Sequence, residues 1–434
     1  MRKTALLTAV VVLAAAGLLV LQRLNQEQQY RQLLDQGEQA LRRGRPYAAI
    51  EAFSGALALR PASMVAFYRR GEAYAAQDQN DRAVQDLQEA RRLAPDAIEP
   101  LEALGHLYER QGRYADAADW FAQAADRLKD ADPNLLYELA LARYRAGFPA
   151  AARGPLQRAI ARTDGMAEAH YLLGLVYRDA QQPEDAIASL ERAVKLAPSM
   201  LSARDELADL YRERGRLADE SDELTALASL DDRAGRQIAL AMAMLRARRY
   251  DDALDVLQRP SVAAVASSDP RVAIALGRIY VDRAERLHDS ASIPLALSSL
   301  ASFVSGTPRR SDGLALFGRA LYLSGDAAGA ERLLHEAVAT PPIDPEAFAF
   351  LADAAERASH PDVARDALLS LDVLEGDLAS TDTRAHRARR IGALALAAGD
   401  AHTASQFLTM AITLGGPDAE TQELLARAET QDGN

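Results

Sequence analysis

A sequence pattern of about 34 residues is repeated along this chain, and that period limits the possible folds more than any other feature. The segment "FYRRGEAYAAQDQNDRAVQDLQEARRLAPD" spans Phe67–Asp96, and "LEALGHLYERQGRYADAADWFAQAADRL" follows it with the same pattern. Gly71 recurs as Gly105. Self-similarity of this length indicates stacked supersecondary units rather than two or three independent globular domains.

Each unit carries a small residue followed four positions later by Leu or Phe, a spacing that places both on one helix face. A glycine or alanine in a preceding helix accompanies each pair, which predicts a close crossing of the two helices. The paired positions are Ala49/Phe53, Ala83/Leu87, Ala117/Phe121, Ala152/Leu156, Ala186/Leu190, Glu220/Leu224, Ala253/Leu257, Ala296/Leu300, Ala330/Leu334, Ala364/Leu368 and Ala404/Leu408. Glu220 is the departure, because every other small position is alanine.

The clearest single unit is "LLGLVYRDAQQPEDAIASLERAVKLAP", Leu172–Pro198. This segment resembles the tetratricopeptide repeat, whose pattern it carries at Leu173, Gly174, Tyr177, Ala186, Leu190, Ala193 and Pro198. The resemblance extends over about eleven units between Tyr30 and Asp418. It implies an all-α fold, a tetratricopeptide-type α-solenoid in which helix hairpins form a right-handed superhelix.

The N-terminus carries a second strong signal. "TALLTAVVVLAAAGLLVL", Thr4–Leu21, holds no charge and is close to the length needed to cross a bilayer. We therefore predict one N-terminal transmembrane helix, single-pass, in a bacterial inner membrane. The slight excess of positive charge before the span favours a periplasmic soluble part. A cytoplasm-facing adaptor and a secreted, cleaved protein remain as alternatives.

The predicted organisation has four parts. Residues 1–22 are the signal anchor, residues 23–232 are units one to six, and residues 233–418 are units seven to eleven. Residues 419–434 are a capping helix and tail. The later units are less regular, with insertions near residues 282–294 and 375–384.

Composition argues against several functional classes. The net charge of −12 disfavours a nucleic-acid surface, and the absence of cysteine removes thiolate chemistry and Cys-ligated zinc. No phosphate-binding glycine loop is present, and none of the seven histidines pairs with another at metal-binding spacing. We expect no cofactor, no metal, no small-molecule substrate and no catalytic residues. An enzyme with an unrecognised site in the irregular centre is the remaining alternative.

The resemblance implies that the first helices of the units line a concave groove that binds protein or peptide segments. The expected function is a membrane-tethered scaffold for assembly of a cell-envelope or secretion-related complex. An acidic patch lies beside a tyrosine and leucine patch, and tyrosine suits interfaces because it adds contact area with a polar tip. The candidate groove residues are Tyr68, Glu72, Glu99, Glu102, His106, Tyr137, Leu141, Tyr144, Tyr171, Leu175 and Arg178.

A second, more basic stretch follows in the later units. It contains Arg271, Arg278, Arg319, His386 and Arg389. We expect these residues to face the groove, which would then have halves of opposite charge.

Overall fold

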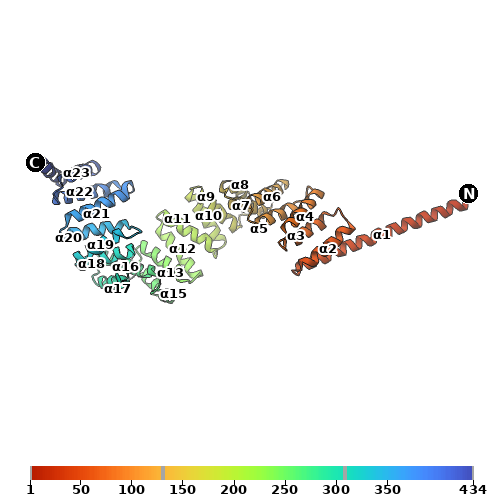
Figure 1. Ribbon diagram of the computed structural model, residues 1–434, viewed down its shortest axis with the longest axis horizontal. Helices are drawn as coiled ribbons and strands as arrows, with labels where there is room; N and C mark the ends of the chain where they lie inside the picture. Colours follow the sequence, from red (N-terminus) through yellow and green to blue (C-terminus); the bar gives the residue numbers. More distant parts are fainter. Residues whose placement is uncertain (1, 129–131, 306–309, 433–434) are drawn as a thin grey trace. The chain divides into compact units, whose positions relative to one another are not determined.

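The computed structural model describes residues 2–128, 132–305 and 310–432 (Figure 1). Across these ranges the chain forms 24 α-helices and one short 3₁₀ helix, and no strand. The chain divides into two compact units, Met1–Leu210 and Tyr211–Asn434. The described residues therefore form the all-α solenoid of helix hairpins that the repeat pattern predicts.

Unit 1 consists of successive antiparallel hairpins, in which each odd-numbered helix comes first and the even-numbered helix packs against it. Its helices are α1 (Arg2–Arg42), α2 (Pro46–Leu59), α3 (Met64–Ala75), α4 (Asn80–Leu93), α5 (Glu99–Arg110), α6 (Tyr114–Arg127), α7 (Pro133–Arg145), α8 (Pro149–Arg162), α9 (Ala167–Asp179), α10 (Pro183–Leu196) and α11 (Leu201–Glu213), the last of which crosses the division.

Unit 2 continues the hairpins, and from α16 onward the even-numbered helix comes first. Its helices are α12 (Leu217–Leu230), α13 (Ala234–Arg246), α14 (Tyr250–Leu257), α15 (Pro260–Ala263), α16 (Pro270–Arg286), α17 (Ser292–Ser305), α18 (Ser311–Ser324), α19 (Ala327–Ala339), α20 (Pro345–Arg357), α21 (Pro361–Glu375), η1 (Gly376–Leu378), α22 (Thr381–Ala397), α23 (Ala401–Gly415) and α24 (Ala419–Asp432).

The small and large residues of each pair form the core of each hairpin, as predicted. All of them are buried, and where the first helix carries glycine at the small position, that glycine lies against the large residue of the second helix. A Cβ atom added at Gly105 would lie 2.5 Å from Phe121 Cε1, and one added at Gly174 would lie 2.6 Å from Leu190 Cγ. The close crossing that was inferred from glycine in a helix interior is confirmed.

The irregular centre has a physical cause in the sequence. α14 is only 8 residues long, and α15 starts at Pro260 after a break. Proline lacks a backbone N–H and clashes with the preceding turn, so it begins a new helix more readily than it continues one. The two insertions lengthen first helices, because α16 and α22 each contain 17 residues, whereas α5 contains 12.

The predicted membrane anchor is not supported. Among the described residues, no helix combines the length and apolar character that a bilayer crossing requires, which is about 20 apolar residues. Within Thr4–Leu21, the side chains of residues 4–12 and 14–16 lie outside the description. The described part of this run, Leu13 and residues 17–21, is exposed on α1. The single-pass inner-membrane location is contradicted by this finding.

Candidate functional site

The predicted groove residues lie on four consecutive first helices of unit 1, which are α3, α5, α7 and α9. Adjacent helices of this set contact one another between α3 and α5 and between α7 and α9. We call the surface that these helices form the first-helix face of unit 1. Which of its residues bind a partner is a prediction, and the contacts below describe what each of them can do.

On α3, Tyr68 and Glu72 form one hydrogen-bonded group. The Tyr68 hydroxyl donates to Glu72 Oε1 at 2.9 Å, and Arg69 Nη1 donates to Glu72 Oε2 at 2.9 Å. Burial and the neighbouring Glu72 carboxylate raise the pKa of Tyr68. The Arg69 guanidinium also lies over the Tyr68 ring, 5.2 Å from its centroid, so this group is fixed in place by several contacts.

A hollow of about 250 Å³ opens between α3 and α5. Its lining is largely apolar, with charged side chains at the rim, and it contains two of the predicted residues, Glu72 and His106. Arg110 closes one side, because its Nη2 donates to the Ala75 carbonyl oxygen at 2.8 Å. The complete lining is Glu72, Ala75, Ala76, Leu87, Ala103, His106, Leu107 and Arg110.

Carboxylates surround the exposed His106 imidazole. His106 Nε2 lies 3.6 Å from Glu138 Oε2, and Nδ1 lies 3.9 Å from Glu109 Oε2. Burial is the main cause that raises the pKa of Glu102 and of Glu138, and neighbouring carboxylates add to it. Glu109 has a close cation, because Arg145 Nη1 donates to its Oε1 at 2.7 Å. Glu99 is exposed at the start of α5.

Sequence reasoning missed Glu138, although the repeat contained a signal for it. The position two residues before the small residue of the first helix holds Arg69, Ala103 and Glu138 in three successive units. All three contribute to the first-helix face, since Arg69 binds Glu72, Ala103 lines the hollow and Glu138 faces His106.

On α7 and α9 the predicted aromatic residues are half-buried. Tyr137, Leu141, Tyr144 and Tyr171 pack against one hydrophobic cluster, and Leu175 belongs to its buried core. Leu175 is therefore a core residue and does not lie open on the surface. Burial, followed by a hydrogen bond to Asp179, raises the pKa of Tyr144 to about 12.

Arg178 is held by two carboxylates. Its Nη2 donates to Asp179 Oδ1 at 2.9 Å, and its Nη1 pairs with Glu206. The α9 end of the first-helix face therefore offers aromatic and neutralised surface, whereas the α5 and α7 part is acidic.

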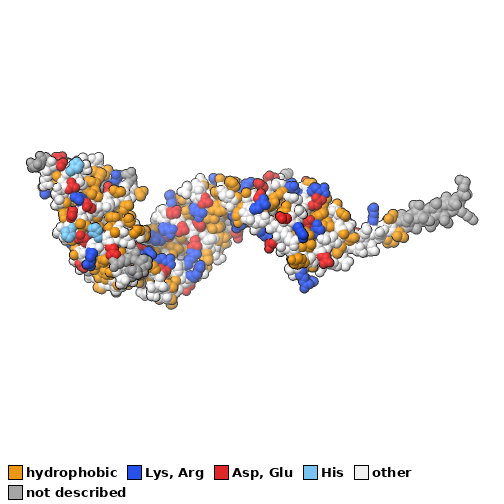
Figure 2. All heavy atoms as spheres, in the orientation of Figure 1, with side chains coloured by type: hydrophobic (Ala, Val, Ile, Leu, Met, Phe, Trp, Pro, Cys, Tyr) orange, Lys and Arg blue, Asp and Glu red, His pale blue; other side chains and the backbone are white. Residues whose placement is uncertain are grey.

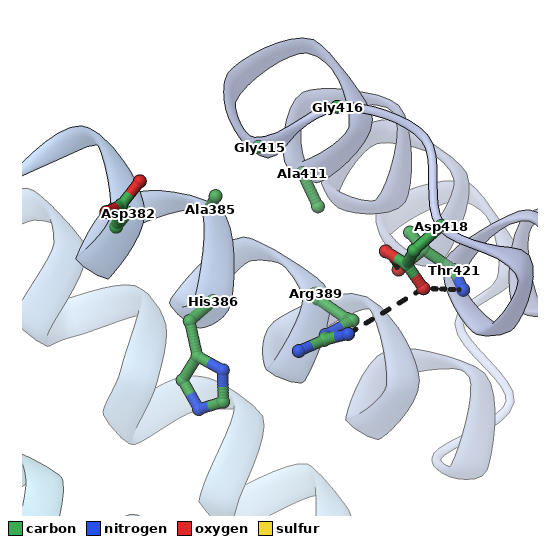
Figure 3. A pocket seen from close by; sticks show the side chains of 9 residues that line it. All are labelled: Asp382, Ala385, His386, Arg389, Ala411, Gly415, Gly416, Asp418 and Thr421. Carbon is green, nitrogen blue, oxygen red and sulfur yellow. Dashed lines mark hydrogen bonds and ion pairs between the residues drawn. The ribbon is translucent and has the colours of Figure 1, made fainter.

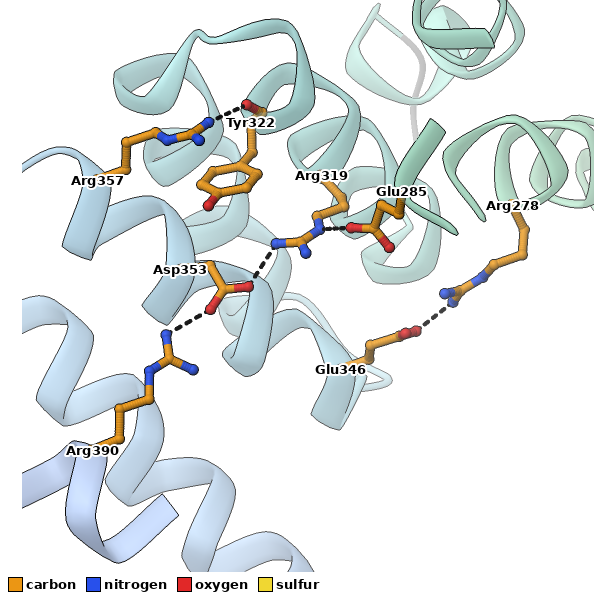
Figure 4. A network of polar contacts seen from close by, with 8 residues as sticks. All are labelled: Arg278, Glu285, Arg319, Tyr322, Glu346, Asp353, Arg357 and Arg390. Carbon is orange, nitrogen blue, oxygen red and sulfur yellow. Dashed lines mark hydrogen bonds and ion pairs between the residues drawn. The ribbon is translucent and has the colours of Figure 1, made fainter. Parts of the chain in front are cut away.

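The first helices of unit 2 carry an ion-pair ladder instead (Figure 4). Arg319 of α18 pairs with Glu285 of α16, and its Nη1 donates to Asp353 Oδ2 of α20 at 2.7 Å. Asp353 Oδ1 accepts from Arg390 Nη2 of α22 at 2.6 Å, and Arg278 Nη2 donates to Glu346 Oε2 at 2.5 Å. The basic half that the sequence predicts is thus largely neutralised.

Two of the three remaining basic positions, Arg271 and Arg389, also have partners among the described residues. Arg271 Nη2 donates to Asp269 Oδ2 at 2.6 Å. Figure 3 shows Arg389 pointing toward Asp418, with Arg389 Nη1 and Asp418 Oδ1 3.7 Å apart, at a hollow of about 240 Å³ between the last helices. Asp418 also accepts from the Thr421 backbone N–H at 2.9 Å, so this carboxylate caps α24. His386 is exposed at the same hollow.

Within the described part of the chain, no group of three His, Asp or Glu side chains could hold a metal ion. Figure 2 shows basic and acidic side chains interspersed over the visible face, without a large field of one sign. A surface with interspersed charges lacks the clustered basic patch that is typical of nucleic-acid binding.

Comparisons with known proteins identify the repeats. Family models for the tetratricopeptide repeat match residues 34–98, 101–136, 137–200 and 173–234. Residues 34–234 therefore carry tetratricopeptide repeats, apart from two residues between the matches, and the resemblance inferred from the sequence is confirmed there.

Curated relatives match parts of the chain. DnaJ homolog subfamily C member 3 of Gallus gallus is 26% identical over an alignment of 248 residues, and the match covers 51% of this chain and 49% of that protein. The small glutamine-rich tetratricopeptide repeat-containing protein 2 of Mycosarcoma maydis is 32% identical over 95 residues, 22% of this chain and 27% of that protein. The chain thus spans about half the length of the first relative and about a quarter of the second.

Solved structures with similar hairpins include YrrB, described as a tetratricopeptide-repeat protein with an unusual peptide-binding site. It has a TM-score of 0.39 and 18% identity, and the match covers 46% of this chain and 100% of YrrB. The human IFIT1 dimer has a TM-score of 0.45 and 17% identity, with coverage of 86% and 91%. Scores this low carry no conclusion about ligands.

Proposed function

We propose that this chain is a scaffold that binds a segment of a partner protein on the first-helix face of unit 1. The proposal assigns no catalytic step to the chain. Membrane tethering and a role in the cell envelope form no part of it. The partner segment would lie across α3, α5, α7 and α9.

The hollow between α3 and α5 is the observation that carries this proposal. It combines buried leucine side chains, Leu87 and Leu107, with a polar rim that includes Glu72 and His106. Binding sites are typically concave and apolar, with a few polar groups that fix orientation. Half-buried tyrosines on α7 and α9 extend this surface, and such residues provide contact area at low entropic cost.

Site-specific photocrosslinking tests the location of the site. A photoreactive amino acid replaces His106 or Tyr171 on the first-helix face, and Glu51 on the exposed side of α2 serves as the control position. In lysate from cells that express the full chain, we expect discrete crosslinked partners at His106 and Tyr171 and none at Glu51. Equal crosslinking at all three positions would contradict the proposed location.

A matched pair of variants tests the aromatic surface. Tyr137→Ala combined with Tyr144→Ala removes two half-buried rings, and we expect it to reduce the yield of the crosslinked partner by roughly ten-fold or more. Circular dichroism of the variant must show an intact helix content. Tyr47→Ala, which removes an exposed ring from α2, is the control and should leave the yield unchanged.

A further inference from the structure

The charges on the first-helix face of unit 1 restrict the chemistry of the partner segment, given that the proposed function is correct. Glu102 and Glu138 are half-buried carboxylates on neighbouring helices, and His106 lies beside both. Among the described residues, the Glu102 carboxylate has no hydrogen-bond or ion-pair partner, and the contact of the Glu138 carboxylate is with His106 at 3.6 Å. This part of the face holds negative charge with little close compensation.

The same carboxylates compete with one another. Glu99 and Asp132 act on Glu102, and Glu109, Glu102 and Asp132 act on Glu138, each raising the pKa of its neighbour. Partial burial adds to the cost of ionisation, since a buried charge is unfavourable unless it is paired. A cation from outside would relieve both the repulsion and the burial cost.

A metal ion does not fit this role, because the described residues contain no three His, Asp or Glu side chains close enough to ligate one. A lysine or arginine side chain does fit, since a guanidinium or ammonium group forms charge-assisted hydrogen bonds with one or two carboxylates.

The hollow between α3 and α5 indicates that the partner segment also carries an apolar side chain. It lies directly beside the carboxylates, because His106 lines it and also faces Glu138. Its lining includes the buried side chains of Leu87 and Leu107, and Ala103 contributes only a methyl group to it. An apolar side chain placed here would remove its surface from water at a favourable free energy.

From this juxtaposition we infer that unit 1 recognises a basic, apolar polypeptide segment, in which an apolar side chain enters the hollow between α3 and α5 and an adjacent lysine or arginine pairs with Glu102 and Glu138. The two contacts together restrict the sequence of the partner segment more than either contact alone. An acidic segment would meet like charges, and a purely polar basic segment would leave the hollow unfilled.

Selection from a random peptide library displayed on phage tests the inference with the full chain as bait. We expect the recovered peptides to be positively charged and to contain an apolar residue beside lysine or arginine. A fluorescein-labelled copy of one recovered peptide then reports affinity by fluorescence anisotropy.

Four variants test which residues of the chain bind the peptide. Glu102→Gln and Glu138→Gln should each weaken binding by roughly ten-fold, the size expected for one charge-assisted hydrogen bond. Glu51→Gln on α2 removes the same charge from the control side and should leave binding unchanged. Ala103→Leu fills the hollow and should weaken binding by roughly ten-fold or more while circular dichroism stays unchanged.

The outcomes separate this inference from the proposed function. Acidic or uncharged peptides that crosslink to α3 and α5 would overturn the inference and leave the proposed site standing. Basic peptides whose affinity is indifferent to Glu102→Gln, Glu138→Gln and Ala103→Leu would overturn the inference as well. If the photoreactive positions on the first-helix face capture neither peptide nor protein, the proposed function itself is wrong.

Discussion

Replacing Gly105 with alanine should destabilise unit 1, even though alanine is the better helix former. A Cβ atom at this position would lie 2.5 Å from Phe121 Cε1 and 2.7 Å from Cδ1, whereas carbon atoms in contact prefer about 3.5–4.0 Å. The Phe121 ring is fully buried and cannot swing into solvent. Overpacking of this kind costs about 1–3 kcal/mol, and the gain from replacing glycine in a helix is about 0.5–1 kcal/mol. The difference between these ranges is a net loss of about 0–2.5 kcal/mol, with a mid-range value of about 1 kcal/mol.

Gly235 is the matched control. It is exposed in the first turn of α13, it is not followed by proline, and a Cβ atom there would meet nothing within 4 Å. Gly235→Ala should therefore stabilise the chain by up to about 0.5 kcal/mol, because the entropic advantage of alanine acts without a clash. The two substitutions are chemically identical, and only the space around them makes the predicted signs differ.

The assay is guanidinium unfolding followed by circular dichroism, with hydrogen exchange of the α5 and α6 amides to localise the effect. A repeat array opens in parts, so the exchange of the local helices reports the change most directly. If Gly105→Ala is as stabilising as Gly235→Ala, the close crossing is not under packing constraint and the reasoning fails.

A compensating change makes the test sharper. The next unit holds Ala140 opposite Leu156, so the same architecture accepts alanine where the facing residue is leucine. Gly105→Ala combined with Phe121→Leu should be less destabilising than the sum of the two single changes, because the smaller side chain makes room for the methyl group. Strict additivity would show that the two positions do not contact each other.

Three further predictions follow from buried and paired charges. Arg246→Ala should cost about 3 kcal/mol in unfolding measurements, because it removes the main partner of the fully buried Glu220 carboxylate, whereas Glu220→Ala should be nearly neutral. Burial raises the pKa of Glu102 and of Glu138, so their contribution to the free energy of unfolding is present at low pH and is lost as pH rises through the raised pKa values. The double variant with glutamine at both positions should therefore be more stable than the unchanged chain at neutral pH. This difference in stability should disappear when the pH falls below the ordinary pKa of a carboxyl group. Asp353→Asn weakens two links of the ladder and should cost about 1 kcal/mol or less, with the difference decreasing at high salt in urea unfolding.

Much of the fold could be predicted from sequence because the constraint is local and repeated. A small residue and a large one four positions apart must share a helix face, and a glycine in the facing helix indicates where the backbones come close. Phe53, Leu300 and Leu408 are all buried for this reason. No long-range information was needed to place them.

The candidate site was less predictable than the fold. The repeat period predicts where each helix lies in the sequence, but it does not determine which face of that helix remains exposed to solvent. The repeat spacing places Leu175 among the groove residues, yet Leu175 belongs to the buried cluster around α9, since this helix packs against neighbours on several sides. Glu102 and His106 could be placed on one face by their spacing of one helical turn. The hollow beside them depends on Leu87 of another helix, and only the packed structure shows it.

Glu220 shows how a departure from the repeat is accommodated. Its carboxylate occupies the position of a small alanine and has no exposed surface. Arg246, 26 residues further along the chain, pairs with it from α13, and Arg249 donates to the neighbouring Ser221 hydroxyl at 3.1 Å. The sequence marked the anomaly but could not name the partner, because many arginines are within reach of a helix whose neighbours are unknown.

The arginines of unit 2 show why a count of charges along the sequence gives a poor picture of the surface. Arg319 lies between two carboxylates, and its guanidinium also stacks 4.8 Å from the Tyr322 ring centroid and 4.7 Å from that of Phe350. Such a group is held in place, so it contributes to the register of α16, α18 and α20 rather than to a free positive field. Glu102 is in the opposite situation, since no cation among the described residues pairs with it. Specificity for a charged partner depends on which charges folding leaves uncompensated, and this criterion supports the proposal that unit 1 recognises the partner segment.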